Sequence, residues 1–185
     1  MKLSREQIVD EAITLLHEQG LKQVTLRNLA DRLDMKAPSL FWYFKNKDEL
    51  LALIDETIFR QCIECIPDCS TWQEWVRLYG LSMWEAQSRA PDIPNLITQV
   101  NLSLETRQTL YQLLHDKLSP YGLDMSVAMK LQSSVQALIT GWTVLTNLPR
   151  RKEALPDIEF SPLRDDITHA LDVLIQGWEV DLGQH

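Results

Sequence analysis

The chain has 185 residues, of which 45% are hydrophobic, so it can bury a core as one domain of typical size or as two small ones. Its first residues, MKLSREQIVDEA, lack the apolar stretch of a signal peptide, and no run approaches the roughly 18 apolar residues that span a bilayer, so we expect a cytoplasmic protein with no membrane partner. Three cysteines, all between positions 62 and 69, do not make the disulfide framework of a secreted domain.

The net charge of -8 is unevenly distributed. Residues 1–47 carry eight Lys and Arg against six Asp and Glu, a net charge of +2, whereas residues 48–185 carry ten against twenty, a net charge of -10. Affinity for phosphates comes from Lys and Arg, so the total alone argues against a nucleic-acid partner. A mildly basic head on an acidic body is nevertheless compatible with DNA binding through the head.

Two helices are predicted at the start of the chain. Ser4, followed three residues later by Gln7, makes a capping box for an apolar helical repeat over residues 5–19, and Gly20 ends it. Thr25 then begins a second helix, LRNLADRL, which is followed by a three-residue break at 34–36.

A short third helix and a longer fourth helix follow. Pro38 suits the first turn of a helix that we expect to run to Phe44. Asn46, with Glu49 three residues later, caps a fourth helix that we expect to reach residue 66, where Pro67 stops it.

The rest of the chain predicts longer helices and no strand, because no stretch shows sustained period-two alternation. The fold class is therefore all-α, with a helix-turn-helix domain at 1–47 and a larger helical domain at 48–185. The predicted helices cover about 71–89, 93–98, 103–118, 124–147 and 162–180, and an exposed loop is expected at 149–161.

The second and third predicted helices have the proportions of a helix-turn-helix, whose second helix enters the major groove of DNA. At 100° per residue, Leu40 and Phe44 share the core side, while Phe41 and Trp42 point outward. Such exposed aromatics could pack against another subunit or a later helix, or could contact thymine methyl groups and sugars in the groove. Lys45 and the lysine two residues later are placed to neutralise phosphates.

Residues 4–54 resemble the N-terminal domain of the TetR family of bacterial transcriptional regulators, and LFWYFKNKDELL resembles its most diagnostic segment. The resemblance implies a set of DNA contacts at Thr25, Arg27, Ala37, Pro38, Ser39, Phe41, Trp42, Tyr43 and Lys47. Many members carry tyrosine where this chain has Phe41, so one hydroxyl contact to phosphate is missing here.

The same resemblance implies a repressor that binds a palindromic double-stranded DNA operator as a homodimer and is released by a small-molecule effector. Two apolar stripes, at 131–145 and 167–178, fit a dimer of paired helices, although both stripes could instead be used up inside one monomer. The expected dimer interface contains Leu131, Leu138, Trp142, Leu171, Leu174 and Trp178.

The helix at 71–89 also resembles, more weakly, the subgroup that contains the tetracycline repressor. That subgroup holds tetracycline and magnesium with histidines, and the matching segments FRQCIECIP and DIPNLITQV have none, so we predict neither ligand and no metal site. We expect instead a neutral, partly aromatic ligand in a pocket of apolar walls with a few amides and hydroxyls. The candidate pocket residues are Met83, Trp84, Gln87, Asn101, Leu104, Gln136, Thr140 and Thr143.

Cys62, Cys65 and Cys69 could sense thiol oxidation or a metal, or could be ordinary packed side chains. The four histidines are scattered and no glycine-rich phosphate loop is present, so we expect no enzyme, no catalytic residues and no cofactor. Two alternatives remain open: a DNA-binding protein without a small ligand, controlled by a protein partner or by these cysteines, and a helical interaction or enzyme module that does not bind DNA.

Overall fold

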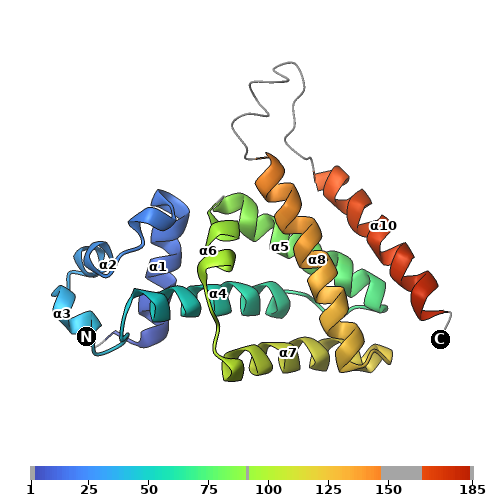
Figure 1. Ribbon diagram of the computed structural model, residues 1–185, viewed down its shortest axis with the longest axis horizontal. Helices are drawn as coiled ribbons and strands as arrows, with labels where there is room; N and C mark the ends of the chain where they lie inside the picture. The colour runs from blue at the N-terminus through green and yellow to red at the C-terminus, as the bar shows by residue number, and fades with distance from the viewer. Residues whose placement is uncertain (1–2, 91, 147–163, 184–185) are drawn as a thin grey trace, which may run out of the picture.

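The computed structural model describes residues 3–90, 92–146 and 164–183, and the loop predicted at 149–161 lies outside them. Over the described residues the chain forms nine α-helices, two short 3-10 helices and no strand, which confirms the predicted all-α fold (Figure 1). None of the helices in those ranges combines the length and the apolar character needed to cross a membrane.

The head of the molecule is built from four segments, and two of its helices begin at the predicted residues. Ser4 Oγ accepts a hydrogen bond from the Gln7 amide at 3.2 Å, and Gln7 Oε1 accepts one from the Ser4 amide at 2.8 Å. Thr25 caps the next helix by accepting from the Asn28 amide. The segments are α1 (Arg5–Gln19), η1 (Leu21–Gln23), α2 (Leu26–Arg32) and α3 (Ala37–Leu40).

The third helix is shorter than predicted, because α3 ends at Leu40 rather than Phe44. The amides of Trp42 and Tyr43 bond to carbonyls three residues back, on Ser39 and Leu40, so the helix tightens into a turn. This turn lets the chain reverse before the cap at Asn46.

The body lies beside the head, to its right in Figure 1, and contains the longest helices of the described chain. They are α4 (Lys47–Glu64), α5 (Trp72–Arg89), α6 (Ile93–Gln99), α7 (Leu104–Leu118), η2 (Ser119–Tyr121), α8 (Met125–Thr146) and α10 (Arg164–Leu182).

Two hydrophobic cores share α4. Its first half contributes Leu50 and Ile54 to the head core, together with Ile93 of α6, whereas Cys62 and Ile63 near its other end belong to the body core. The head core therefore extends past residue 47. The predicted boundary after that residue stays a prediction, but α4 physically connects the two cores.

A glycine lets α5 and α10 approach closely. A Cβ atom at Gly80 would lie 2.5 Å from Cδ2 and 2.7 Å from Cδ1 of Leu171, which is fully buried. Arg77 and Asp172, on the same two helices, form an ion pair beside this contact. The C-terminal helix is thus fitted against α5 of its own chain.

Candidate functional site

The turn after α3 presents two large aromatic side chains to solvent. Phe41 is 59% exposed and Trp42 is 90% exposed, whereas Leu40 and Phe44 are at most 1% exposed. The predicted division into core and outward residues is therefore confirmed for these four positions. Folding of the described residues therefore leaves almost all of the Trp42 side chain in solvent.

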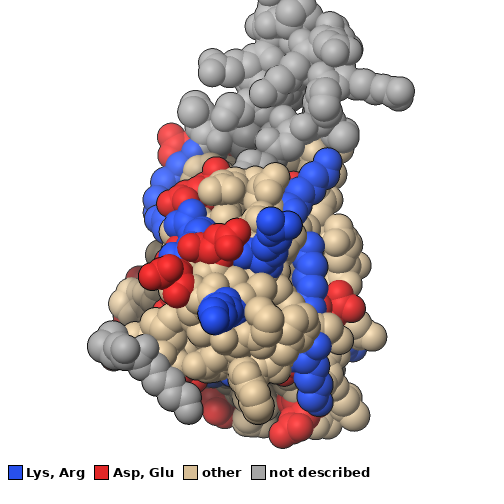
Figure 2. All heavy atoms as spheres, turned by 90° about the vertical axis from the view of Figure 1, so that its left-hand side faces the viewer, with Lys and Arg blue, Asp and Glu red and all other residues tan. Residues whose placement is uncertain are grey.

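Several Lys and Arg side chains of the head form no ion pair with a described Asp or Glu side chain. Of these, Arg27, Lys36 and Lys45 are exposed, and Lys47 is half-buried. By contrast, Arg32 is held by two carboxylates of α1 at 2.6 Å each. Figure 2 looks onto this end of the molecule and shows Lys and Arg side chains running down it in a broken line, with Asp and Glu side chains beside them.

One of these cations, Lys36, was missed, whereas a phosphate contact was predicted for Lys45. The signal for Lys36 in the sequence is positional, because it directly precedes α3, as Lys45 directly follows the aromatic turn. Lys36 and Lys45 thus lie before and after the exposed Phe41 and Trp42 in the chain, which is the arrangement expected of phosphate contacts beside a groove contact.

The remaining predicted DNA contacts differ in availability. Pro38 is exposed, Ala37 and Ser39 are half-buried, and Thr25 uses its hydroxyl to cap α2. The Tyr43 hydroxyl donates to the carbonyl of Leu3 at 3.1 Å, so in this conformation its hydrogen holds the N-terminal segment.

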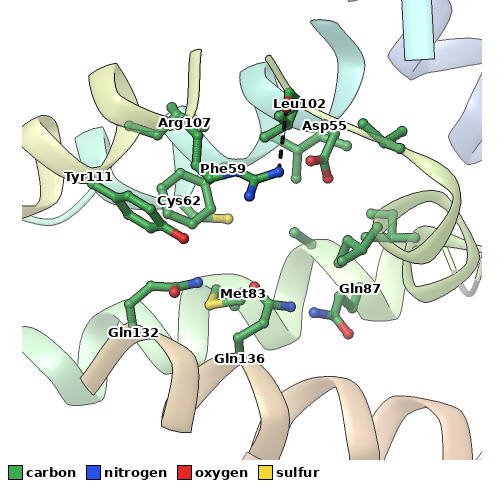
Figure 3. Close-up of a pocket in the computed structure, with 16 residues that line it drawn as sticks. Asp55, Phe59, Cys62, Met83, Gln87, Leu102, Arg107, Tyr111, Gln132 and Gln136 are labelled. Atoms are coloured by element: carbon green, nitrogen blue, oxygen red, sulfur yellow. Dashed lines mark hydrogen bonds between the residues drawn. The ribbon is translucent and has the colours of Figure 1, made fainter. Parts of the chain in front are cut away.

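A cavity of about 250 Å³ lies in the body between α4, α5, α6, α7 and α8 (Figure 3). Its walls are mainly apolar and aromatic, with amides from α5 and α8 along one side. The lining residues are Asp55, Ile58, Phe59, Cys62, Met83, Ala86, Gln87, Ile93, Ile97, Val100, Leu102, Arg107, Leu110, Tyr111, Gln132 and Gln136.

Three of the predicted pocket residues line this cavity: Met83, Gln87 and Gln136. Thr140 stands behind them, where its Oγ1 accepts hydrogen bonds from the side-chain amides of Gln87 at 3.2 Å and Gln136 at 2.7 Å. The Gln87 side chain is only 2% exposed, and its Oε1 has no hydrogen-bond partner among the described residues.

The other four predicted pocket residues lie elsewhere. Trp84 packs against the body core, and the Thr143 hydroxyl donates to the Ile139 carbonyl of its own helix. Leu104 is 72% exposed, and Asn101 lines a separate polar hollow between the head and the start of α7. Leu104 is the first residue of α7 and Asn101 lies three residues before it, and neither side chain lines the cavity.

Charged residues of the cavity were missed by the sequence reasoning. Asp55 of α4 lines the cavity without a hydrogen bond or ion pair to any described residue, and burial raises its pKa from 3.8 to about 6. Arg107 of α7 also lines it, and donates to the Leu102 carbonyl at 3.4 Å. The signal for Asp55 was its position: with Ile58, Phe59 and Cys62 it follows an i, i+3, i+4, i+7 pattern on one face of α4.

Two of the three cysteines, Cys62 and Cys69, do not have the setting of reactive thiolates. Cys62 is 6% exposed, and burial raises its pKa to about 11; burial and the nearby Glu74 also raise the pKa of Cys69. Reactive cysteines need the opposite shift. Throughout the described ranges, no group of three or more Cys, His, Asp or Glu side chains is placed to hold a metal ion.

The expected dimer interface is only partly on the surface. Leu131 and Leu171 are at most 1% exposed because they fill the body core, so they have no surface to offer a second copy. Leu138 and Leu174 are half-buried, as are the predicted tryptophans at 142 and 178. The large exposed apolar side chains on the described parts of α8 and α10 are Val144, Leu145, Val173 and Val180.

The short helix α6 touches both the cavity and the head. Ile93 and Ile97 line the cavity, while the carboxylate of Asp92, just before α6, accepts a hydrogen bond from the Leu21 amide at 2.9 Å. Gly20 lies at φ +82° against the same carboxylate. Any displacement of α6 by a molecule in the cavity would therefore reach the end of α1.

Comparison with known proteins gives one family. The family model for bacterial regulatory proteins of the tetR family matches residues 8–54. The class D tetracycline repressor protein of Escherichia coli is 29% identical over 207 residues, covering 98% of this chain and 91% of that protein. The class C protein of Escherichia coli is 42% identical over 57 residues, covering 31% of this chain and 26% of that protein.

Solved structures share the fold over nearly the whole chain. A TetR variant from Acinetobacter baumannii AYE in complex with minocycline is 23% identical with a TM-score of 0.70, covering 96% of this chain and 97% of that one. ActR of Streptomyces coelicolor in complex with (S)-DNPA is 20% identical with a TM-score of 0.71, covering 98% of this chain and 100% of that one.

Proposed function

Because this chain belongs to the TetR family of bacterial transcriptional regulators, we propose that it is a repressor that binds a palindromic operator as a homodimer and is released by a small molecule in the cavity. The observation that carries the proposal is Trp42, which is 90% exposed at the end of a helix-turn-helix, with the exposed Lys45 three residues after it in the chain.

The head would bind DNA through two kinds of contact. Phe41 and Trp42, with Pro38 and Ser39, would enter the major groove and contact thymine methyl groups and sugars. Arg27 and the lysines at 36, 45 and 47 would neutralise phosphates on either side, while Thr25, Ala37 and Tyr43 would lie along the same surface. A salt-dependent affinity follows, because each neutralised phosphate releases counterions.

The dimer would form through the outward faces of α8 and α10. Val144, Leu145, Val173 and Val180 are apolar and exposed there, and added Cβ atoms at Gly141 and Gly177 would meet nothing within 4 Å, so a second copy could approach closely. Two-fold symmetry would set the recognition helices about one helical turn of DNA apart, roughly 34–36 Å.

Release of the operator would follow from a change in the position of the head relative to the body. A molecule in the cavity contacts α4 and α6, and these elements also carry part of the head core and the Asp92 link to Leu21. An effector shifts this equilibrium only by binding the DNA-incompetent form more tightly, so operator DNA must weaken effector binding by the same factor. Relatives of known structure hold minocycline and (S)-DNPA, which supports a small-molecule site in this fold.

The test begins with selection of bound fragments from the host genome, followed by footprinting and sedimentation of the free and bound protein. The expected result is a protected palindrome occupied by two chains, with affinity lost in Trp42→Ala. Thr109→Ala, an exposed position on α7 far along the chain from the head, serves as the control. A protein that enriches no sequence, or a Trp42→Ala variant that binds as well as the parent, would exclude this function.

A further inference from the structure

We propose that the effector carries a protonated amine and that Asp55 binds this group inside the cavity. The inference rests on the proposed function, since it concerns the molecule that would release the operator. It replaces the neutral ligand expected from the sequence with a cationic one.

The unsatisfied polar atoms of the cavity wall are acceptors. Asp55 projects from α4 without a partner among the described residues, and Gln87 presents a buried Oε1 that likewise lacks one. Figure 3 shows them on opposite walls, toward the same end of the cavity. A buried acceptor without a donor costs stability, so a ligand with several N–H donors would supply the hydrogen bonds that these acceptors lack.

The surroundings favour a positive charge over a neutral donor. A carboxylate in a mainly apolar wall is poorly solvated, and the raised pKa of Asp55, about 6, has burial as its cause. A cation beside it would hold Asp55 ionised at neutral pH. Phe59 and Tyr111 line the same cavity, and their ring faces attract cations as well.

Arg107 is the competing explanation, because Asp55 could exist simply to pair with it. No ion pair joins the two, and the Arg107 guanidinium donates instead to the Leu102 carbonyl. Arg107 is an exposed residue of α7, whereas Asp55 is half-buried. Asp55 is therefore the charged side chain of the cavity wall that makes neither an ion pair nor a hydrogen bond with a described residue.

Three small molecules with one carbon skeleton test the charge directly: phenylbutylamine, phenylbutanol and phenylbutyrate. Isothermal titration calorimetry at pH 7.5 would measure their binding to the parent, to Asp55→Asn and to Glu56→Gln. Glu56→Gln is the matched control, because it removes the same charge from the next residue of α4, which pairs with Arg60 rather than lining the cavity.

The parent should bind the amine about tenfold more tightly than the alcohol, since a charge-assisted hydrogen bond replaces a neutral one. Asp55→Asn should lose this preference, and Glu56→Gln should keep it. An amine that does not bind, that binds no better than the alcohol, or that keeps its preference in Asp55→Asn overturns the proposal. Thermal unfolding of each variant establishes that it is folded. The Arg107→Gln variant tests the competing explanation, because a structural pairing of Asp55 with Arg107 predicts that Asp55→Asn and Arg107→Gln lose the same amount of stability.

Titration with pH gives a second measurement on the unaltered chain. The other titratable groups that line the cavity are Arg107, Tyr111 and Cys62, and no histidine lines it. Lowering the pH from 7.5 to 5 should weaken the amine severalfold and leave the alcohol unchanged, because protonation of Asp55 removes the anion. Equal pH profiles for the two probes would count against Asp55.

The two proposals fail in different ways. If the alcohol or the acid binds and releases a selected operator while Asp55→Asn changes nothing, the repressor stands and the amine does not. If the amine prefers Asp55 but no operator is ever selected, the cavity site stands and the repressor function does not.

Discussion

Replacing Asp55 by asparagine should make the ligand-free protein more stable at neutral pH. The carboxylate lies in the cavity wall without a counterion, and its pKa rises to about 6 from 3.8. Folding therefore raises the free energy of the ionised form, and an amide of the same shape escapes that cost.

The magnitude follows from the size of the pKa shift. A difference of about two pKa units corresponds to roughly 3 kcal/mol between the two protonation states. Asp55 keeps some contact with water through the cavity, so we expect a gain of about 1–2 kcal/mol, or about 3–6 °C in Tm for a chain of this size.

The dependence on pH has a definite sign. Because the folded pKa lies above the unfolded one, the folded state binds more protons between about pH 4 and 6, and the parent loses stability as the pH rises through that window. The advantage of Asp55→Asn should be full at pH 7.5 and nearly absent at pH 4.

Urea unfolding at both pH values measures this difference, at one protein concentration because the proposed dimerisation would shift the apparent stability. Glu56→Gln is the control, and since Glu56 is partly exposed and paired with Arg60, it should show no gain. The reasoning is refuted by an Asp55→Asn protein that is less stable than the parent at pH 7.5, or by an advantage that does not change with pH.

Three further outcomes are expected. Trp42→Ala should weaken operator binding about tenfold or more by anisotropy, yet leave Tm within about 1 °C, because 90% of this side chain is already in water; a large loss of Tm would mean that Trp42 is structural. Asp92→Ala should cost about 1 kcal/mol and speed hydrogen exchange of the Leu21 amide, measured by NMR, since it removes that donor's acceptor; unchanged exchange would show that the link is unimportant. Iodoacetamide at pH 8 should label Cys65, which is exposed, well before Cys62, whose pKa is about 11, as followed by mass spectrometry; earlier labelling of Cys62 would mean that its helix opens.

The helices could be predicted because their signals are local. Ser4, Thr25, Asn46 and Thr71 each cap a helix by bonding to an amide three residues later, and such contacts depend on a few neighbouring residues only. The end of the third helix was missed because the turn after Leu40 is set by the return of the chain to α4, which no local pattern encodes.

The cavity could be predicted only in part, because its wall combines residues from five helices. Gln87 and Gln136 were predicted as amides in an apolar wall, but Asp55 was not predicted, because its place in the cavity also depends on how α7 packs across from α4. The same limit applies to Leu131 and Leu171, since an apolar stripe shows that a face is covered and not by which chain.

The fit of Gly80 to Leu171 also restricts how this protein can change over time. An alanine at position 80 would press on both methyl groups of a fully buried leucine, whereas a smaller residue at 171 would leave a void beside the glycine. We expect either substitution alone to lower the stability of the fold. Together they conserve volume, because the added methyl group fills the space that the smaller side chain leaves. Relatives that have lost the glycine should therefore carry a smaller side chain at position 171, and the order in which lineages acquired the two changes should leave a trace of the destabilised intermediate.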